Sequence, residues 1–386
     1  MSADDTFIDE YRQLKSWLLD AAYPLWWQRG ADREAGGFHE RLTLDALPTG
    51  EARRARLHPR QMCAFAAARD LGWNGPGDDA VRHALAFFRA HYFRSDGLVR
   101  ASVDVQGAAL DESAVLYDQA FALLGFAAAF EALRDADCRA GAAALLTEVR
   151  GAFAHSRGFD ETLTRSIPLL ANSHMHLLEA CLAWRELDTG WDDVAAGIVA
   201  LVFDRLLDDR VDAITEFFAR DWTPLQGDHG RIVEPGHQFE WAWLLMRWAS
   251  ATQQPEIARR ALQLVDASEQ HVHTRRQVAM NSLVIHGSAL IVRDPNARLW
   301  PQTERIKANL LAARTTGDSR YVGNAGRALR ALRGYLEAPT PGLWRDTLNV
   351  DGTFAIEPAP ASSFYHLVCA AQECERYARS RFGALI

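Results

Sequence analysis

Residues 120–130 read AFALLGFAAAF and contain neither a charged nor a hydrogen-bonding side chain. A helix at a protein surface carries polar residues along one face, whereas a helix that is apolar on every face is enclosed on every face. Residues 239–248, FEWAWLLMRW, are also apolar around most of a helical turn. Runs of this length are too short for a membrane span. We therefore expect both segments to be helices surrounded by other helices.

Helical periodicity extends over most of the chain, because apolar residues recur at three- and four-residue spacing in about a dozen segments. Convincing strands are few, and residues 97–104 and 352–358 are expected to form hairpin arms or loops. No linker or low-complexity run divides the sequence, so we expect one domain over residues 1–386. The expected helices cover residues 7–27, 78–93, 112–133, 138–156, 172–187, 191–207, 237–251, 255–271, 300–316, 319–337 and 363–379.

About twelve helices in one domain are compatible with two architectures, an open solenoid and a closed (α/α)6 barrel. Solenoid repeats show a fixed sequence period, and we find none in this chain. The segments that are apolar all round suit the inner ring of a closed barrel. We therefore expect an all-α protein with the (α/α)6 barrel fold.

The composition limits the classes of partner. The net charge of −8 argues against nucleic acid, which is bound by clustered Lys and Arg. The N-terminal sequence MSADDTFIDEYRQ is acidic and lacks the apolar core of a signal peptide, and no apolar run is long enough to suggest a membrane partner. The five cysteines are scattered, which is typical of reduced thiols in a cytoplasmic protein. Monomer and homodimer both stay open.

Titratable residues gather in the first turns of the expected helices. In residues 234–245, EPGHQFEWAWLL, His237 and Glu240 directly follow a proline and a glycine. If these helices form an inner ring, their N-terminal ends face one mouth of the barrel and converge on one pocket. The positive end of a helix helps to keep a histidine neutral, as a general base must be. Other first turns contribute Arg60, Tyr117, Asp118, His176, Glu304 and His366, with Asn172 and Ser362 or Ser363 as expected N-caps.

Each of these residues also has a purely structural explanation. A single first-turn histidine is more often a surface or capping residue, and His-x-x-Glu spacing arises often by chance. The pairs His174/His176 and His271/His273 resemble metal ligands, but side chains two positions apart on a helix point to different faces. Metal-binding and nucleotide-binding motifs are absent from the sequence. We therefore expect neither a metal nor a cofactor.

Taken together, the motifs are more specific than any one of them. Seven stretches occur in order along nearly the whole chain, and the sequence resembles the N-acylglucosamine 2-epimerase superfamily of sugar epimerases and aldose–ketose isomerases. The stretches are WWQRGADREAGGFHERL (26–42), RLHPRQMCAF (56–65), VLYDQAFAL (115–123), NSHMHLLEA (172–180), PGHQFEWAWLL (235–245), RLWPQTERIKA (298–308) and SSFYHLVCA (362–370).

The resemblance implies an (α/α)6 barrel that acts on a monosaccharide without a metal. It implies two acid/base histidines on opposite sides of the sugar, which match His237 and His366. The positions that match the substrate-contacting residues of the superfamily are Arg60, Tyr117, Asn172, His176, Glu240, Trp300 and Glu304.

The WPQTE form at residues 300–304 resembles the mannose isomerase branch, which implies interconversion of D-mannose and D-fructose, or of D-lyxose and D-xylulose, through an enediol. On this hypothesis His366 is the base at C2, and His237, oriented by Glu240, is its acid/base partner. Arg60 and His176 would stabilise charge on the sugar oxygens. The alternative is a sugar 2-epimerase that uses the same two histidines.

Two other classes of function stay open at this stage. An inverting glycosidase would need two carboxylates across the cleft, for which Glu240 and Glu304 are candidates. A helical scaffold would need no titratable pocket at all. The basic cluster Arg54, Arg56 and Arg60 also leaves an anionic sugar open, and residues 41–58 are a candidate lid.

Overall fold

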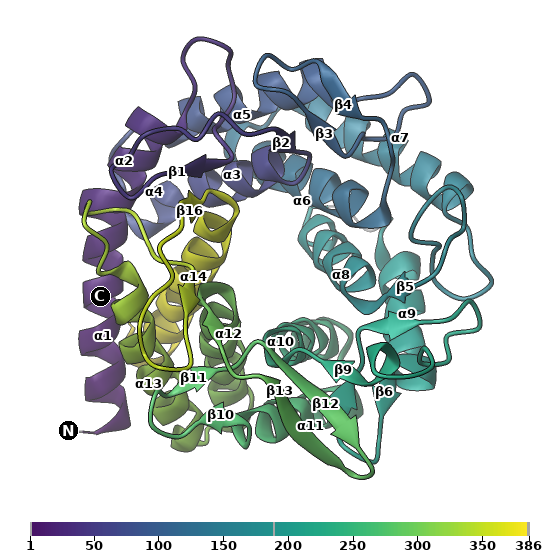
Figure 1. Cartoon of the computed structure of the whole chain (residues 1–386), viewed down its shortest axis with the longest axis vertical. Coiled ribbons are helices and arrows are strands. Elements are labelled where there is room, and N and C mark those ends of the chain that lie inside the picture. The colour runs from purple at the N-terminus through teal and green to yellow at the C-terminus, as the bar shows by residue number, and fades with distance from the viewer. Residues whose placement is uncertain (1, 188–189, 384–386) are drawn as a thin grey trace.

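A ring of helices surrounds the centre of the molecule (Figure 1). In the computed structural model, which describes residues 2–187 and 190–383, six inner helices each contact the next, and the last contacts the first. The expected (α/α)6 barrel is confirmed. The expected domain, residues 1–386, includes residues 1, 188–189 and 384–386, which lie outside the described residues. The inner helices are α3 (Leu57–Ala66), α6 (Leu116–Leu133), α8 (Ala171–Arg185), α10 (Pro235–Thr252), α12 (Leu299–Thr316) and α14 (Ser362–Phe382).

An outer layer of amphipathic helices covers the ring, and most of these helices pack on the inner helix that precedes them in sequence. Helix α1 instead packs against α13 and α14, which joins the two ends of the chain. Short helical turns at Leu18–Ala22, Trp26–Gly30 and Val202–Leu206 extend this layer, and the turn His229–Arg231 lies among the connecting strands. The outer helices are α1 (Ala3–Trp17), α5 (Gly77–His91), α7 (Ala136–Ala152), α9 (Asp192–Leu201), α11 (Pro255–Glu269) and α13 (Ser319–Leu336), with the short α2 (Tyr23–Leu25) and α4 (Ala68–Leu71).

Helix α6 contains the apolar run that predicted the architecture. Within the described chain it is the one helix long and apolar enough to cross a membrane by length and composition. It packs between α3 and α8, and 67% of this segment is buried inside the protein. Its composition is therefore explained by its place in the inner ring.

Buried polar side chains fix the start of the inner helices. Three of the inner helices have a glutamine as their fourth residue, and its side chain binds the backbone of one residue in the preceding connection. The amide oxygen accepts from that residue's N–H, and the amide nitrogen donates to its C=O. The pairs are Gln119 with Val99, Gln238 with Ile214 and Gln302 with Ala279. Each of the two bonds is 2.7–2.9 Å long. His58 and His174 accept from a backbone N–H in the same way. We call these five residues the anchor residues. They pair backbone groups that would otherwise be buried without a partner.

Short antiparallel strands join the helices at the end of the barrel where the inner helices begin (Figure 1). The longest hairpin, β12–β13, turns at Gly287, which has a left-handed φ of 63°. Sequence periodicity did not predict this hairpin, because its strands SLVIH and ALIVRD contain short continuous apolar runs, which spacing alone cannot distinguish from helix segments. The strands are β1 (Arg41–Leu42), β2 (Arg53–Arg54), β3 (Ser102–Val103), β4 (Ala109–Asp111), β5 (Leu169–Leu170), β6 (Leu207–Asp208), β7 (Ala213–Ile214), β8 (Phe217–Phe218), β9 (Ile232–Val233), β10 (Val272–His273), β11 (Val278–Ala279), β12 (Ser282–His286), β13 (Ala289–Asp294), β14 (Ala297–Arg298), β15 (Thr347–Leu348) and β16 (Ala359–Pro360).

Several helix starts differ from the expectation. Asn172 is the second residue of α8 and not its N-cap, and Ser362 begins α14 after the N-cap Ala361. The helix expected from residue 112 begins at Leu116, because β4 pairs with β3 immediately before it. Of the two expected extended segments, 97–104 contains β3, whereas 352–358 contains no named strand.

Close packing of α6 on α3 generates a testable prediction. A Cβ atom added at Gly125 would lie 2.7 Å from the backbone Cα of Pro59, so Gly125→Ala must push α3 and α6 apart. We expect the free energy of unfolding to fall by about 1–3 kcal/mol, as for other overpacked cores. Urea denaturation monitored by circular dichroism measures this loss.

The control is Gly141→Ala on α7. Its added Cβ would lie 3.6 Å from the ring of Phe126, an ordinary contact, and alanine favours a helix by up to about 1 kcal/mol over glycine. An unfolding midpoint of Gly125→Ala equal to or above that of the wild type would contradict the predicted steric conflict.

Candidate active site

A cavity of about 800 Å³ opens at the N-terminal ends of the inner helices. Glu304, the ninth residue expected in the site, does not line this cavity, because it is fully buried behind His366. The expected site residues that line the cavity are Arg60, Tyr117, Asn172, His176, His237, Glu240, Trp300 and His366.

The indole of Trp300 lies between the two expected acid/base histidines. Its ring centre is 4.9 Å from that of His237 and 5.8 Å from that of His366. Gly236 makes this arrangement possible, because a Cβ atom there would lie 2.5 Å from the Trp300 ring. Both imidazoles are therefore neighbours of one apolar ring in the cavity wall.

His366 is held by a buried carboxylate and a buried ammonium group. Its Nδ1 lies 2.9 Å from Oε1 of Glu304, and Nζ of Lys307 lies 2.6 Å from Oε2 of the same residue. Burial raises the pKa of Glu304, and the charge of Lys307 opposes that shift. With Nδ1–H donating to Glu304, the Nε2 atom of a neutral His366 keeps its lone pair.

The protonation state of His366 follows from its surroundings. Burial lowers its pKa well below the ordinary histidine value, and the positive charges of Arg60 and Lys307 lower the pKa further. His366 is therefore a neutral imidazole at pH 7, able to accept a proton.

His237 has the opposite electrostatic environment. Its Nδ1 lies 2.9 Å from Glu216 and 3.5 Å from Glu234. Burial alone would lower its pKa, but Glu216, Glu234 and Glu240 outweigh burial and raise the pKa to about 10. His237 is therefore an imidazolium at pH 7, in contrast to the neutral histidine that the helix N-terminus alone predicts.

The partner of His237 also differs from the expectation. Glu216 makes the hydrogen bond to the ring, whereas Glu240 contributes only through its charge. Glu216 lies between β7 and β8, 21 residues before His237, and the sequence around it carries no motif that marks this role. Glu216 is the main site residue that sequence reasoning missed.

His176 forms a third buried imidazole–carboxylate pair. Its Nδ1 lies 3.2 Å from Glu179, which also accepts a hydrogen bond from the hydroxyl of Tyr365. Burial lowers the pKa of His176 to about 4, although Glu179 opposes the shift. His176 is therefore neutral at pH 7 and fixed in orientation.

Glu240 is buried within the same cluster of titratable groups. Burial raises its pKa well above the ordinary value, and the charges of Glu304 and Glu179 act in the same direction. Together with His176 and Glu179 it has the donor atoms of a cation site, all within 4.8 Å of one another. Lys307 and Arg60 interact electrostatically with Glu179 and Glu240 and so offset part of the negative charge that a cation would neutralise. The expectation of a metal-free site stays a prediction.

Polar atoms without a partner point to where a ligand can bind. Arg60 donates to the hydroxyl of Tyr117 at 2.9 Å and its guanidinium carbon lies 4.2 Å from the ring centre of Phe121. Among the described residues, buried atoms Arg60 Nε, Asn172 Oδ1 and Glu240 Oε1 have no hydrogen-bond partner. Buried polar groups are rarely left unpaired, so these atoms are suited to the hydroxyl and carbonyl groups of a small polar molecule.

Two imidazoles with opposite protonation states flank one cavity. Titratable groups whose environments push their pKa values apart are suited to complementary acid and base roles. The site can therefore accept a proton at His366 and donate one at His237.

The fold and this site define an enzyme of the sugar epimerase and isomerase superfamily. The family model of N-acylglucosamine 2-epimerase (GlcNAc 2-epimerase) matches residues 36–370, and the chain belongs to this family.

Known relatives carry both types of activity in their names. The chain is 43% identical to a protein of Rhizobium meliloti (strain 1021) named mannose-6-phosphate isomerase, over 94% of this chain and 96% of that protein. A solved D-mannose isomerase has a TM-score of 0.84 at 18% identity, covering 94% of this chain and 97% of that one. Cellobiose 2-epimerase from Bacillus thermoamylovorans B4167 has a TM-score of 0.85 at 17% identity, covering 96% and 100%. The two structural likenesses support the barrel fold.

The environment of His237 predicts a specific pH dependence. If protonated His237 is needed, kcat/KM should fall only above about pH 10. Glu216→Gln removes a negative charge, lowers the pKa of His237 and should move this alkaline limb to lower pH by about one unit or more. Steady-state kinetics across pH measure the shift.

Glu256→Gln, on the exposed face of α11, is the matched control and should leave the pH profile unchanged. An alkaline limb that stays in place in Glu216→Gln would mean that His237 does not titrate in that limb.

Proposed function

We propose that the protein is an aldose–ketose isomerase for a mannose-configured sugar and that it transfers a proton through an enediol. The observation that carries the proposal is the pairing of a neutral His366 with a protonated His237 across Trp300. The name of the 43% identical relative supports a mannose-type substrate.

The proposed reaction starts from the open-chain aldose. Nε2 of His366 takes the proton from C2, the C2–H electron pair forms the C1–C2 double bond, and the carbonyl oxygen O1 takes a proton from His237. His237 then recovers a proton from the hydroxyl at C2, and His366 returns its proton to C1. The product is the ketose, and both histidines end in their starting states.

Neighbouring groups would lower the barrier of this step. Glu304 accepts from Nδ1–H of His366 and so stabilises the imidazolium that forms when the proton arrives. Arg60 offers hydrogen-bond donors for charge that develops on the sugar oxygens. Lys307 would act indirectly, because it contacts Glu304 and does not line the cavity.

The second candidate is a 2-epimerase, which the name of the cellobiose 2-epimerase neighbour brings into consideration. In that reaction His237 would deliver its proton to C2 from the face opposite His366. Mannose would then yield glucose, whereas the isomerase yields fructose. Chromatography of the products distinguishes the two reactions directly.

Solvent deuterium tests the proton route. With mannose or mannose 6-phosphate in D2O, we expect the ketose product to gain deuterium at C1 over many turnovers, because the proton on His366 exchanges with solvent. NMR of the product measures the label. A product that stays free of deuterium would contradict the enediol step, and loss of activity with a chelator, restored by a divalent ion, would contradict the metal-free route.

Substitution of the histidines tests their roles. His366→Asn and His237→Asn should each lower kcat by about 10²- to 10⁴-fold, the range of general acid–base catalysis, while the melting temperature is kept. The control His286→Asn changes an exposed residue of β12 and should retain activity. Near-normal turnover in His366→Asn would favour a binding protein or a different base.

A further inference from the structure

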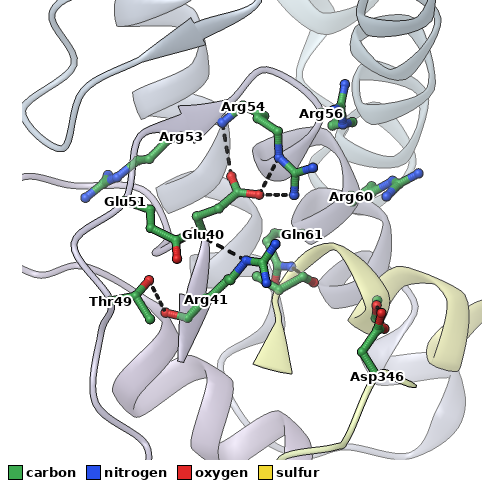
Figure 2. A network of polar contacts seen from close by, with 12 residues as sticks. Glu40, Arg41, Thr49, Glu51, Arg53, Arg54, Arg56, Arg60, Gln61 and Asp346 are labelled. Atoms are coloured by element: carbon green, nitrogen blue, oxygen red, sulfur yellow. Dashed lines mark hydrogen bonds and ion pairs between the residues drawn. The ribbon is translucent and has the colours of Figure 1, made fainter. Parts of the chain in front are cut away.

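Four arginines at the rim of the cavity have no role in the proposed proton transfer. Arg41 lies in β1, Arg54 in β2 and Arg56 directly before α3. Arg298 directly precedes α12. Figure 2 shows the first three on adjacent stretches of chain, with Arg60 on the helix that follows.

Each of these guanidinium groups is held from one side by a carboxylate. Arg54 donates from Nε to Glu40 at 2.6 Å, and Glu40 is only 3% exposed. Arg56 donates to the buried Asp118 at 3.0 Å. Arg41 lies 3.3 Å from Glu51, and Arg298 lies 2.9 Å from Asp346. A guanidinium has five N–H donors, so each arginine keeps donors beyond those that its carboxylate uses.

The rim is fixed relative to the proposed base. β1, which contains Arg41, pairs with β16, and Ala361 donates to the carbonyl oxygen of Glu40. β16 leads directly into α14, which carries His366. A group bound at the rim would therefore lie at a defined distance from the proton-transfer end of the cavity.

The charge of the cavity wall favours an anion at neutral pH. Burial raises the pKa of Glu161 to about 8, and burial also raises the pKa values of Glu234 and Glu240. Glu161 is therefore largely uncharged at pH 7, while the arginines stay charged. Glu357 is a further carboxyl group of this wall. Asp346 is paired with Arg298.

The wall is poorly suited to a second sugar ring. A sugar ring stacks on aromatic side chains. Within the described chain the aromatic residues of the wall, apart from the three histidines, are Tyr117 and Trp300. Trp300 already lies between the histidines. The rest of the rim offers guanidinium donors, which bind phosphate oxygens through two N–H groups at once.

We propose that Arg41, Arg54 and Arg56 bind the phosphate group of a phosphorylated monosaccharide whose carbonyl end lies between His237 and His366. This inference rests on the proposed isomerase function and adds the substrate class. Arg298 lies on the same cavity wall and adds positive charge.

The experiment compares mannose and mannose 6-phosphate with the full-length enzyme. The wild type should show a kcat/KM at least about tenfold higher for the phosphorylated sugar. In Arg41→Gln/Arg54→Gln this preference should shrink by about 10- to 100-fold through KM, because charged hydrogen bonds to phosphate are lost. Inorganic phosphate should inhibit mannose turnover by the wild type and inhibit the double variant more weakly.

Two further variants keep the test decisive. Arg41→Gln alone changes a pair in which both side chains are partly exposed. We therefore expect it to fold even if the double variant, which leaves the buried carboxylate of Glu40 without Arg54, does not fold. Arg82→Gln removes an exposed arginine of α5 and should keep the full preference.

The outcomes separate the two proposals. A wild-type enzyme that isomerises mannose with no preference for the phosphorylated sugar, or a preference that survives in the arginine variants, would overturn the phosphate site and leave the isomerase intact. Turnover of neither sugar would overturn the proposed function itself. Inhibition by inorganic phosphate without any preference between the sugars would mean that the rim binds free phosphate only, and this also overturns the proposal.

Discussion

The hydrogen bonds of the anchor residues to the preceding backbone set the rotation of the inner helices. Successive residues of a helix are 100° apart, so residues two before and two after an anchor both point away from it, toward the barrel axis, and lie on one face as an i, i+4 pair. Each anchor thereby positions the pair of residues on either side of it. The pairs are Arg56 and Arg60 around His58, Tyr117 and Phe121 around Gln119, Asn172 and His176 around His174, Gly236 and Glu240 around Gln238, and Trp300 and Glu304 around Gln302. In α14 the apolar Phe364 has the equivalent place between Ser362 and His366.

Equivalent helix starts nevertheless produce unequal histidines. His237 is the third residue of α10 and His366 the fifth residue of α14, so both lie near a helix N-terminus, where the helix field disfavours an imidazolium. The number of nearby charges decides the outcome, because His237 faces several carboxylates whereas His366 is near Arg60 and Lys307. Burial strengthens each of these interactions. A difference in neighbours, carried by an otherwise repetitive scaffold, thus separates an acid from a base.

Much of the fold was predictable from sequence, because helical periodicity is a local signal. The apolar run of α6 indicated an enclosed helix, and the first-turn positions of His176, His237 and His366 indicated a shared pocket. The helix starts were less accurate, since inner helices such as α8 begin with an anchor bond to another segment and not with a local side-chain cap. In three inner helices the anchor bond is made by a glutamine, in the sequences YDQAF, HQFE and PQTE. The recurrence of glutamine near the helix start would have indicated these starts, but apolar periodicity does not take polar residues into account.

The sequence by itself determined the helical barrel, the residue types at the cavity and the family resemblance, because each is written in local spacing and motifs. Only the tertiary structure decided that Glu216 holds His237, that Glu304 and Lys307 lie behind His366 and that the two rings differ in charge. These contacts join residues as far as 62 positions apart. A pKa depends on burial and on charges through space, and neither can be read from the order of residues along one helix.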